Sequence, residues 1–299
     1  MQALLPVGEA QLVGIGDDAA VLRAPDARVV ATMDLLVEGR HFRRDWSSAV
    51  DVGSKAAAQN LADIAAMGAA PTALLVGFAT PGDVPAAWAR DLVRGLARES
   101  ARAGASVAGG DVSSADTIMI AVTALGDLAG RDPVTRGGAQ PGDQLAVAGR
   151  LGRSAAGLAL LEAGLTRPAG PVAAHRRPKP PYRSGPQAAA LGATSMIDTS
   201  DGLVQDLGHV AAASGVRIDI ETARLADDPQ LRAAAAALGR ADWLGWALAG
   251  GEDHALVATF AASTELPGDW SVIGSVSTGS GVRVDGRSPR GRGGWDHFR

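Results

Sequence analysis

The chain has 299 residues, of which 46% are hydrophobic and 20% charged, and its formal net charge is −4. These values exclude a disordered chain and leave room for two domains, while the mild acidity argues against nucleic-acid and membrane partners. Because cysteine is absent and neither a signal peptide nor a membrane-spanning run is recognisable, we exclude disulfides and thiolate metal sites and expect a cytoplasmic protein.

Lysine is nearly absent from this chain. Only Lys55 and Lys179 occur among the 28 Lys and Arg residues. Neither stands in the GxxxxGK[ST] pattern of a P-loop, and no VAIK strand with a downstream HRD loop is present. If the chain binds ATP, the phosphates must therefore be neutralised by another route.

The first elements in the chain surround a pair of carboxylates. After a short lead-in, Asp17 and Asp18 stand in the glycine turn of GIGDDAAV at 14–21. Two adjacent acids repel each other and favour a bound cation, although Gly-Asp-Asp is also ordinary turn chemistry. Strands are expected at 19–22 and 28–33, with Asp34 at the end of the second, where it is either a turn residue or a ligand.

A helix is predicted over 48–67, where Gly68 and Pro71 end it. Asn60 and Asp63 lie three residues apart and so share one face of this apolar helix. An acid in such surroundings needs a partner unless that face is solvated. A strand at 73–78, a helix at 85–103 and a buried strand at 105–108 follow, and Asp111 comes after the last strand, where α/β folds place ligands.

The second half is expected to begin after a strand at 117–125 and a turn-rich boundary at 131–142. Arg136 in that boundary either grips a phosphate or is a surface charge. A strand at 144–148, a helix at 154–163 and a proline-dense basic surface loop at 175–186 come next. Asp198 and Asp201 then precede a helix that ends at 214, and an N-cap role explains one of these acids but not both.

The remaining elements are strands at 216–220, 255–260, 272–276 and 282–285 and helices near 229–238 and 241–248, with Gly250-Gly-Glu252 before the 255–260 strand.

Oxygen-only ligands select hard cations, and Mg²⁺ is usually held by few carboxylates together with phosphates. Scattered acids therefore predict several Mg²⁺ ions around a polyphosphate. A dinucleotide fingerprint at 14–19 is disfavoured, since two aspartates would repel a pyrophosphate. The acids singled out are Asp17, Asp18, Asp34, Asp63, Asp111, Asp198, Asp201 and Glu252.

Several short motifs, taken in order along the chain, resemble the thiamine-monophosphate kinase family. They are GIGDDAAV (14–21), TMD (32–34), VEGRHF (37–42), NLADIAAMG (60–68), GGD (109–111), RGGAQPGD (136–143), DTSDGL (198–203), GGED (250–253) and WDHF (295–298). The resemblance implies an α/β (α+β) chain with the two-domain aminoimidazole ribonucleotide synthetase-like ATP-binding fold, each domain a mixed sheet packed by helices. Residues 1–137 would form an N-terminal ATP- and Mg²⁺-binding and dimerisation domain, and 138–299 a C-terminal domain that completes the ATP and substrate site. A homodimer is usual in the family.

The resemblance also implies roles for individual residues. Asp63, Asp111 and Asp201 would be catalytic, and Met33 stands where the family usually has a threonine, so that only its backbone carbonyl could reach a metal. The implied Mg²⁺ ligands are Asp18, Thr32, Met33, Asp34, Asp63, Asp111, Asp198 and Asp201. The implied ATP contacts are Gly110, Asp111, Arg136 and Ser200, and the implied thiamine-phosphate contacts are His41, Glu252 and Trp295.

The implied activity is the last step of thiamine diphosphate biosynthesis: direct in-line transfer of the γ-phosphoryl group of ATP, as co-substrate, to thiamine monophosphate. Trp295 offers a cation–π face to the thiazolium, and Glu252 a complementary charge. The alternatives are another ATP-dependent enzyme of the same fold, making selenophosphate or aminoimidazole ribonucleotide, and a non-catalytic Mg²⁺–nucleotide-binding dimer. The absence of cysteine argues against a selenophosphate enzyme, which would be expected to carry a reactive one.

Overall fold

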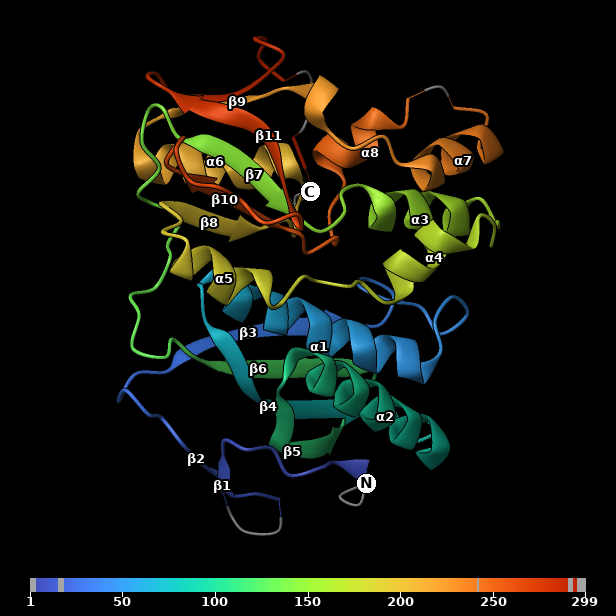
Figure 1. The fold of residues 1–299 in the computed structure, drawn as a ribbon. Helices are drawn as coiled ribbons and strands as arrows, with labels where there is room; N and C mark the ends of the chain where they lie inside the picture. The colour runs from blue at the N-terminus through green and yellow to red at the C-terminus, as the bar shows by residue number, and fades with distance from the viewer. Residues whose placement is uncertain (1–3, 16–18, 241, 290–292, 295–299) are drawn as a thin grey trace. The chain divides into compact units, whose positions relative to one another are not determined.

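A computed structural model describes residues 4–15, 19–240, 242–289 and 293–294 (Figure 1). The chain divides into two compact units: Met1–Ala65 with Ala69–Arg131, and Ala66–Gly68 with Asp132–Arg299. Both units contain a mixed sheet with packed helices, which confirms the predicted fold class. Within the described ranges, no helix is both long and apolar enough to cross a membrane.

The first unit is built on a four-stranded sheet of order β3-β6-β4-β5. Strands β4 and β5 are parallel, whereas β6 is antiparallel to both β3 and β4. A two-stranded sheet of β1 and β2 precedes it in the chain. The bounds are β1 Gln11–Val13, β2 Val21–Leu22, β3 Val30–Val37, α1 Ala49–Ala66, β4 Ala70–Thr80, α2 Ala86–Ala103, β5 Ser106–Ser114 and β6 Met119–Asp127.

The two faces of this sheet differ. On one face, Ile120, Val122 and Ala124 of β6 are fully buried, and Figure 1 shows α1 and α2 on a common side of the sheet. Strand residues alternate between the faces. On the other face, Met33 is 63% exposed and Leu35 is 44% exposed. The sheet therefore has one covered face and one face that presents large apolar side chains to solvent in the single chain.

Two glycines let α1 and α2 approach each other closely. A Cβ atom on Gly53 would lie 2.1 Å from the Leu92 carbonyl oxygen, and one on Gly95 would lie 2.2 Å from the Val50 carbonyl oxygen. Because the obstructing atoms belong to the backbone, no rotamer change could make room. This contact helps to place the helix that carries Asn60 and Asp63.

The second unit has a six-stranded sheet of order β12-β9-β11-β7-β10-β8. Neighbouring strands are antiparallel, except that β12 is parallel to β9. The strands are β7 Gln144–Ala148, β8 Ser195–Asp198, β9 Arg217–Ile220, β10 Leu256–Phe260, β11 Trp270–Ser277 and β12 Gly281–Val284. The helices are α3 Arg153–Glu162, α4 Ala169–Arg176, α5 Ser184–Ala190, α6 Leu203–Ser214, α7 Pro229–Ala237 and α8 Leu244–Ala249, with a 3₁₀ turn η2 at Thr222–Arg224.

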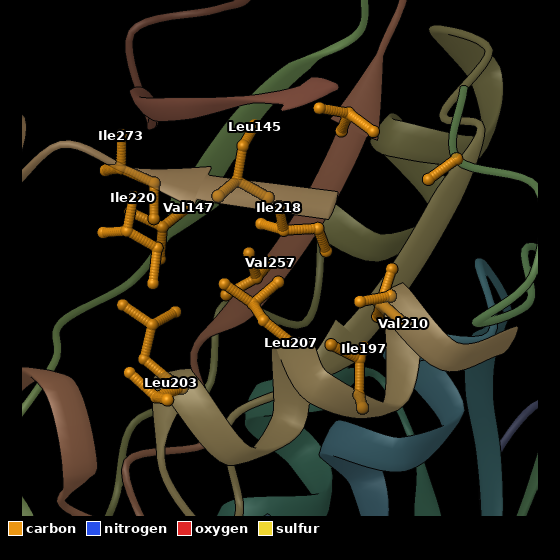
Figure 2. Close-up of a cluster of buried hydrophobic side chains, with 14 of the residues drawn as sticks. Leu145, Val147, Ile197, Leu203, Leu207, Val210, Ile218, Ile220, Val257 and Ile273 are labelled. Atoms are coloured by element: carbon orange, nitrogen blue, oxygen red, sulfur yellow. The ribbon is translucent and has the colours of Figure 1, made fainter. Parts of the chain in front are cut away.

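The core of this unit fixes α6 against the sheet. Figure 2 shows side chains of α6 facing apolar side chains of the strands, all of them buried: Leu203, Leu207 and Val210 against Leu145, Val147, Ile218, Ile220 and Val257. Burying one such side chain is worth about 1.5–3 kcal/mol. The loop between β8 and α6, which contains Asp198 and Asp201, is therefore anchored at both ends.

Three expectations about local structure are wrong. Strand β3 continues through Asp34 to Val37, because it pairs with β6 over its whole length. Strand β5 likewise continues past Asp111 to Ser114 along β4, so neither acid stands at a strand end. The segment at 175–186 is not a surface loop: α4 ends at 176, α5 begins at 184, and His175 and Tyr182 are buried.

Candidate functional site

The first candidate site lies where β3 meets α1 in the first unit. Thr32 and Asp34 are two residues apart on β3 and thus share the face toward the helix. The Thr32 hydroxyl donates to Asp63 Oδ2 at 2.9 Å. Gln59 Nε2 donates to Asp34 Oδ2 at 3.1 Å, and the Asp34 N–H donates to Asn60 Oδ1 at 2.8 Å. Two consecutive residues of α1 therefore orient both the backbone and the carboxylate of Asp34.

Asn60 is the fixed point of this arrangement. It is fully buried, and its own amide donates to the Ala56 carbonyl at 2.9 Å, which leaves its oxygen for the strand. A buried side-chain amide needs a partner for its N–H donor and one for its oxygen acceptor, and here the helix supplies the first and the strand the second. Met33, between Thr32 and Asp34, lies on the opposite, exposed face of the sheet, so its thioether does not join the cluster.

Gly110 and Asp111 lie on the opposite edge of the same sheet. A Cβ atom on Gly110 would be 2.1 Å from the Val76 carbonyl oxygen, so only glycine allows β5 to lie this close to β4. Asp111 pairs with Gly77 of β4, and the same row continues through β6 to Leu35 of β3. Residues paired in one row share a face of the sheet, so Asp111 lies on the exposed face with Leu35. Since three strand spacings of about 4.8 Å separate β5 from β3, this unit does not bring Asp111 beside Asp34.

His41 stands in the turn after β3. Its ring Nδ1 accepts a hydrogen bond from the Val37 N–H at 3.0 Å, and the backbone N–H of His41 donates to the Val37 carbonyl at 3.0 Å. Lys55 Nζ, from α1, donates to the His41 carbonyl at 2.9 Å. Three hydrogen bonds, at the ring, the backbone N–H and the carbonyl, therefore hold His41, the predicted substrate contact, in place.

In the second unit, two loops run side by side around Asp198. This residue is buried at the end of β8, and its Oδ2 lies 3.0 Å from Nδ1 of the buried His254. The Glu252 N–H donates to the Ser200 carbonyl at 2.7 Å, and the His254 N–H donates to the Thr199 carbonyl at 3.0 Å. The predicted residues Asp198, Ser200 and Glu252 are thus brought together.

The backbone of the second loop is strained. Glu252 and His254 have φ angles of +63° and +52°, in the left-handed region that non-glycine residues seldom adopt. Each such residue costs about 1–3 kcal/mol, and such strain concentrates at ligand sites. The strain here supports a binding role for the loop that carries Glu252.

Asp206 is an acid that sequence reasoning missed. It lies in the first turn of α6, and its Oδ2 accepts the N–H groups of Asp201 and Gly202 at 3.2 and 2.9 Å. Burial, together with the nearby Asp198 carboxylate, raises the pKa of Asp206 to about 7. Negative charge is therefore crowded at this helix start. Its position in the first helical turn, where acids are favoured, was the available signal.

Asp253 was missed as well. Its carboxylate accepts the N–H of Ser154 at 2.9 Å and that of Gly152, so it caps the start of α3. Desolvation raises the pKa of Asp253 to about 7, against the lowering effect of those two hydrogen bonds. Next to it, Glu252 Oε2 lies 3.4 Å from Nδ1 of the buried His175. The Gly-Gly-Glu-Asp loop is thus tied to α3 and α4.

Arg136 is exposed, and its carbonyl accepts a hydrogen bond from the Ser214 hydroxyl at 3.2 Å, which ties this loop to the end of α6.

Asp17, Asp18 and Trp295 lie outside the described residues. Among the residues that are described, no three His, Cys, Asp or Glu side chains are grouped closely enough to hold a metal ion by themselves. Any cation here would need ligands from elsewhere, such as phosphates or water.

The two mixed-sheet units with their acid clusters define a protein of the AIR synthase related class. The N-terminal domain of that class matches residues 16–128, and its C-terminal domain matches 140–287. The thiamine-monophosphate kinase of Mycobacterium tuberculosis is 53% identical over 289 residues, 96% of this chain and 86% of that protein. The corresponding kinase of Corynebacterium glutamicum is 43% identical over 296 residues, 95% of this chain and 88% of that protein.

A solved structure of AaThiL complexed with AMPPCP and TMP has a TM-score of 0.85 to this chain at 33% identity, covering 95% of this chain and 92% of that one. The chain belongs to the thiamine-monophosphate kinase family. The resemblance noted from the motifs is thereby confirmed.

Proposed function

We propose that this chain phosphorylates thiamine monophosphate to thiamine diphosphate with ATP as co-substrate, in the cytoplasm. The observation that carries the proposal is the Thr32, Asp34 and Asp63 cluster, which hydrogen bonds from residues 59–63 of α1 hold together against β3 in a chain of this family. The complex of a 33% identical structure with AMPPCP and TMP supports the pair of ligands.

The donor atoms of this cluster fit Mg²⁺. Two carboxylates and a hydroxyl offer only oxygen, and Mg²⁺ typically takes one or two carboxylates, several waters and substrate phosphates. Asp34, Asp63 and Thr32 would hold ions in the first unit, together with Asp18, whereas Asp111, on the other face at the far edge of the sheet, would hold a separate ion. Asp198 and Asp201 would do so in the second unit, where Asp206 adds negative charge. A metal held by these residues would supply the positive charge that neutralises the phosphates, since the chain has no P-loop lysine for that task.

Other residues would bind the two substrates. Arg136, Ser200 and Gly110 would contact ATP, with the Arg136 guanidinium suited to hold a phosphate. Glu252 would meet the cationic or amino end of the thiamine moiety, and Trp295 would stack on it. His41 would contact the phosphate end, as a donor from its ring.

The reaction would be an in-line displacement. A phosphate oxygen of thiamine monophosphate attacks the γ-phosphorus, the bond from that phosphorus to the β–γ bridging oxygen breaks, and ADP leaves. Because the attacking phosphate is already ionised, no strong general base is needed. The task of Asp63, Asp111 and Asp201 is then to hold charge and geometry, which is where most phosphoryl-transfer catalysis lies.

We propose further that the chain acts as a homodimer through the exposed face of the first unit's sheet. Met33 and Leu35 lie exposed on that face, as an interface between copies would require. Leu35→Glu should convert a wild-type dimer into a monomer in sedimentation experiments. A wild-type protein that sediments as a monomer at micromolar concentration would count against this part of the proposal.

The activity is tested by incubating the purified chain with ATP, Mg²⁺ and thiamine monophosphate and separating the products. ADP and thiamine diphosphate in equal amounts are the expected result. Phosphate release without thiamine diphosphate would point to another ATP-dependent enzyme of the same fold. Binding of ATP with no ADP formed would point to the non-catalytic dimer.

A further inference from the structure

Lys55 is a buried ammonium group to which the proposed chemistry gives no role. It is 2% exposed in α1 and is one of only two lysines in the chain. Gln59 and Asp63 follow it at intervals of four residues, so all three lie on one stripe of the helix. A buried charge is costly unless a specific acceptor meets it, and the His41 carbonyl, 2.9 Å from Nζ, is such an acceptor.

The bonds around His41 determine which ring nitrogen carries the proton. The Val37 N–H can only donate, so His41 Nδ1, 3.0 Å away, is the acceptor and has no proton. The proton of the neutral ring is therefore on Nε2, and His41 enters any further hydrogen bond there as a donor. This geometry exists only while the 37–41 turn keeps its shape, and Lys55 holds the far end of that turn.

We propose that Lys55 is a positioning residue: by fixing the His41 carbonyl, it keeps the Nε2–H donor of His41 in place for the phosphorylated substrate. The inference rests on the proposed function and deepens it, since Lys55 itself is too buried to touch a ligand. The same helix thus orients Asp34 through Gln59 and His41 through Lys55, so that the metal ligand and the substrate contact share one rigid support.

Arginine cannot replace this lysine. The neighbours of Lys55 on the helix, Val52, Ala56 and Ala58, are fully packed, and a guanidinium is a larger planar fork than the compact ammonium. A chain whose basic residues are otherwise almost all arginine keeps lysine at this one buried position. The size and point charge of the ammonium, not merely its positive sign, are what the site uses.

The test compares steady-state constants for both substrates in the full-length protein. Lys55→Met, which preserves length and removes the charge, should raise the KM for thiamine monophosphate at least about tenfold while the KM for ATP changes by less than about twofold. Ser54→Ala is the matched control, because Ser54 is also buried in α1 but its hydroxyl contacts Gly95 of α2. It should lower stability and leave both KM values unchanged.

A double-mutant cycle with His41→Ala separates positioning from general support. If Lys55 acts through His41, then adding Lys55→Met to His41→Ala should change the KM for thiamine monophosphate by less than about twofold further. Equal rises of both KM values in Lys55→Met, or independent effects of the two substitutions, would overturn the proposal. Lys55→Gln, which removes the charge and is no larger than lysine, provides the same comparison if Lys55→Met does not fold.

A second readout does not need turnover. The ¹⁵N resonances of the His41 ring, assigned by their loss in His41→Ala, should show a proton on Nε2 in the wild type and a mixture of tautomers in Lys55→Met. A ring signal that is identical in both proteins would overturn the positioning role. Absence of thiamine diphosphate formation by the wild type would instead contradict the proposed function, so the two failures are distinguishable.

Discussion

Asp63 and Asp51 lie on the same helix and offer a direct separation of function from stability. Asp63 receives the Thr32 hydroxyl at 2.9 Å. Asp51 is in the first turn of α1, where it accepts the Ser48 N–H at 3.0 Å and the Ser48 hydroxyl at 2.8 Å, as in a capping box. Replacing each by asparagine removes one negative charge without opening a cavity.

The two substitutions should cost similar stability and very different activity. An asparagine at position 63 keeps an oxygen for the Thr32 hydroxyl, so only the charged part of that bond is lost, about 1 kcal/mol. Losing the acid near the start of α1 costs about 0.5–1 kcal/mol. Either loss is small beside a folding free energy of about 5–15 kcal/mol, so both proteins remain folded. If Asp63 holds a metal as proposed, loss of its charge should lower kcat at least a hundredfold, which is about 2.7 kcal/mol in the barrier.

The assay measures kcat at saturating ATP and Mg²⁺ alongside urea unfolding of each variant. Asp63→Asn should be nearly inactive and Asp51→Asn should retain the wild-type kcat, with unfolding free energies within about 1 kcal/mol of each other. Turnover near the wild-type rate in Asp63→Asn would refute the assignment of Asp63. Equal activity losses in both would show that the helix, not the carboxylate, is what matters.

Three further predictions concern pH, packing and metal. Asp228 caps α7, and although burial works to raise its pKa, the Arg153 guanidinium holds that pKa below the usual 3.8. The pair therefore stabilises the fold above pH 3.8 and loses this effect as the pH falls through the lower pKa of the folded state. Asp228→Asn should lower the Tm at pH 7 and leave it unchanged near pH 2. Gly53→Ala, whose Cβ would meet the Leu92 carbonyl at 2.1 Å, should lower the unfolding free energy by about 1–3 kcal/mol or more, whereas Gly208→Ala in open space on α6 should not. EDTA should abolish turnover reversibly without changing the circular dichroism spectrum, because both cores are apolar.

Helix limits could be predicted from sequence because their signals are local. Pro85 precedes α2 and Gly104 follows it in the left-handed conformation, as their residue types indicate. Strand lengths could not be predicted, since β3 and β5 continue only as far as β6 and β4 offer pairing partners. Asp34 and Asp111 consequently lie inside strands, and the assignment of both to strand ends failed for the same reason.

The residues of the candidate site also divide into those that the sequence could predict and those that it could not. Asn60 and Asp63 could be paired from their spacing, because helical periodicity places residues three apart on one face. The partners of Asp206 and Asp253 could not be predicted, since they are backbone N–H groups that only the folded loops bring to these acids. The proline density around His175 predicts a loop there, whereas its contact with Glu252 arises from the packing of α4.

The partners of each acid distinguish a structural role from a functional one more reliably than its position in the sequence. Arg153 makes two hydrogen bonds to Asp228, at 2.6 and 3.1 Å, so that carboxylate is already neutralised and serves the fold. Gln59, a neutral amide, orients Asp34 without cancelling its charge, and Asn60 fixes its backbone. A carboxylate that is held in place yet keeps its charge is suited to bind a cation, which is why Asp34 fits the magnesium role and Asp228 does not.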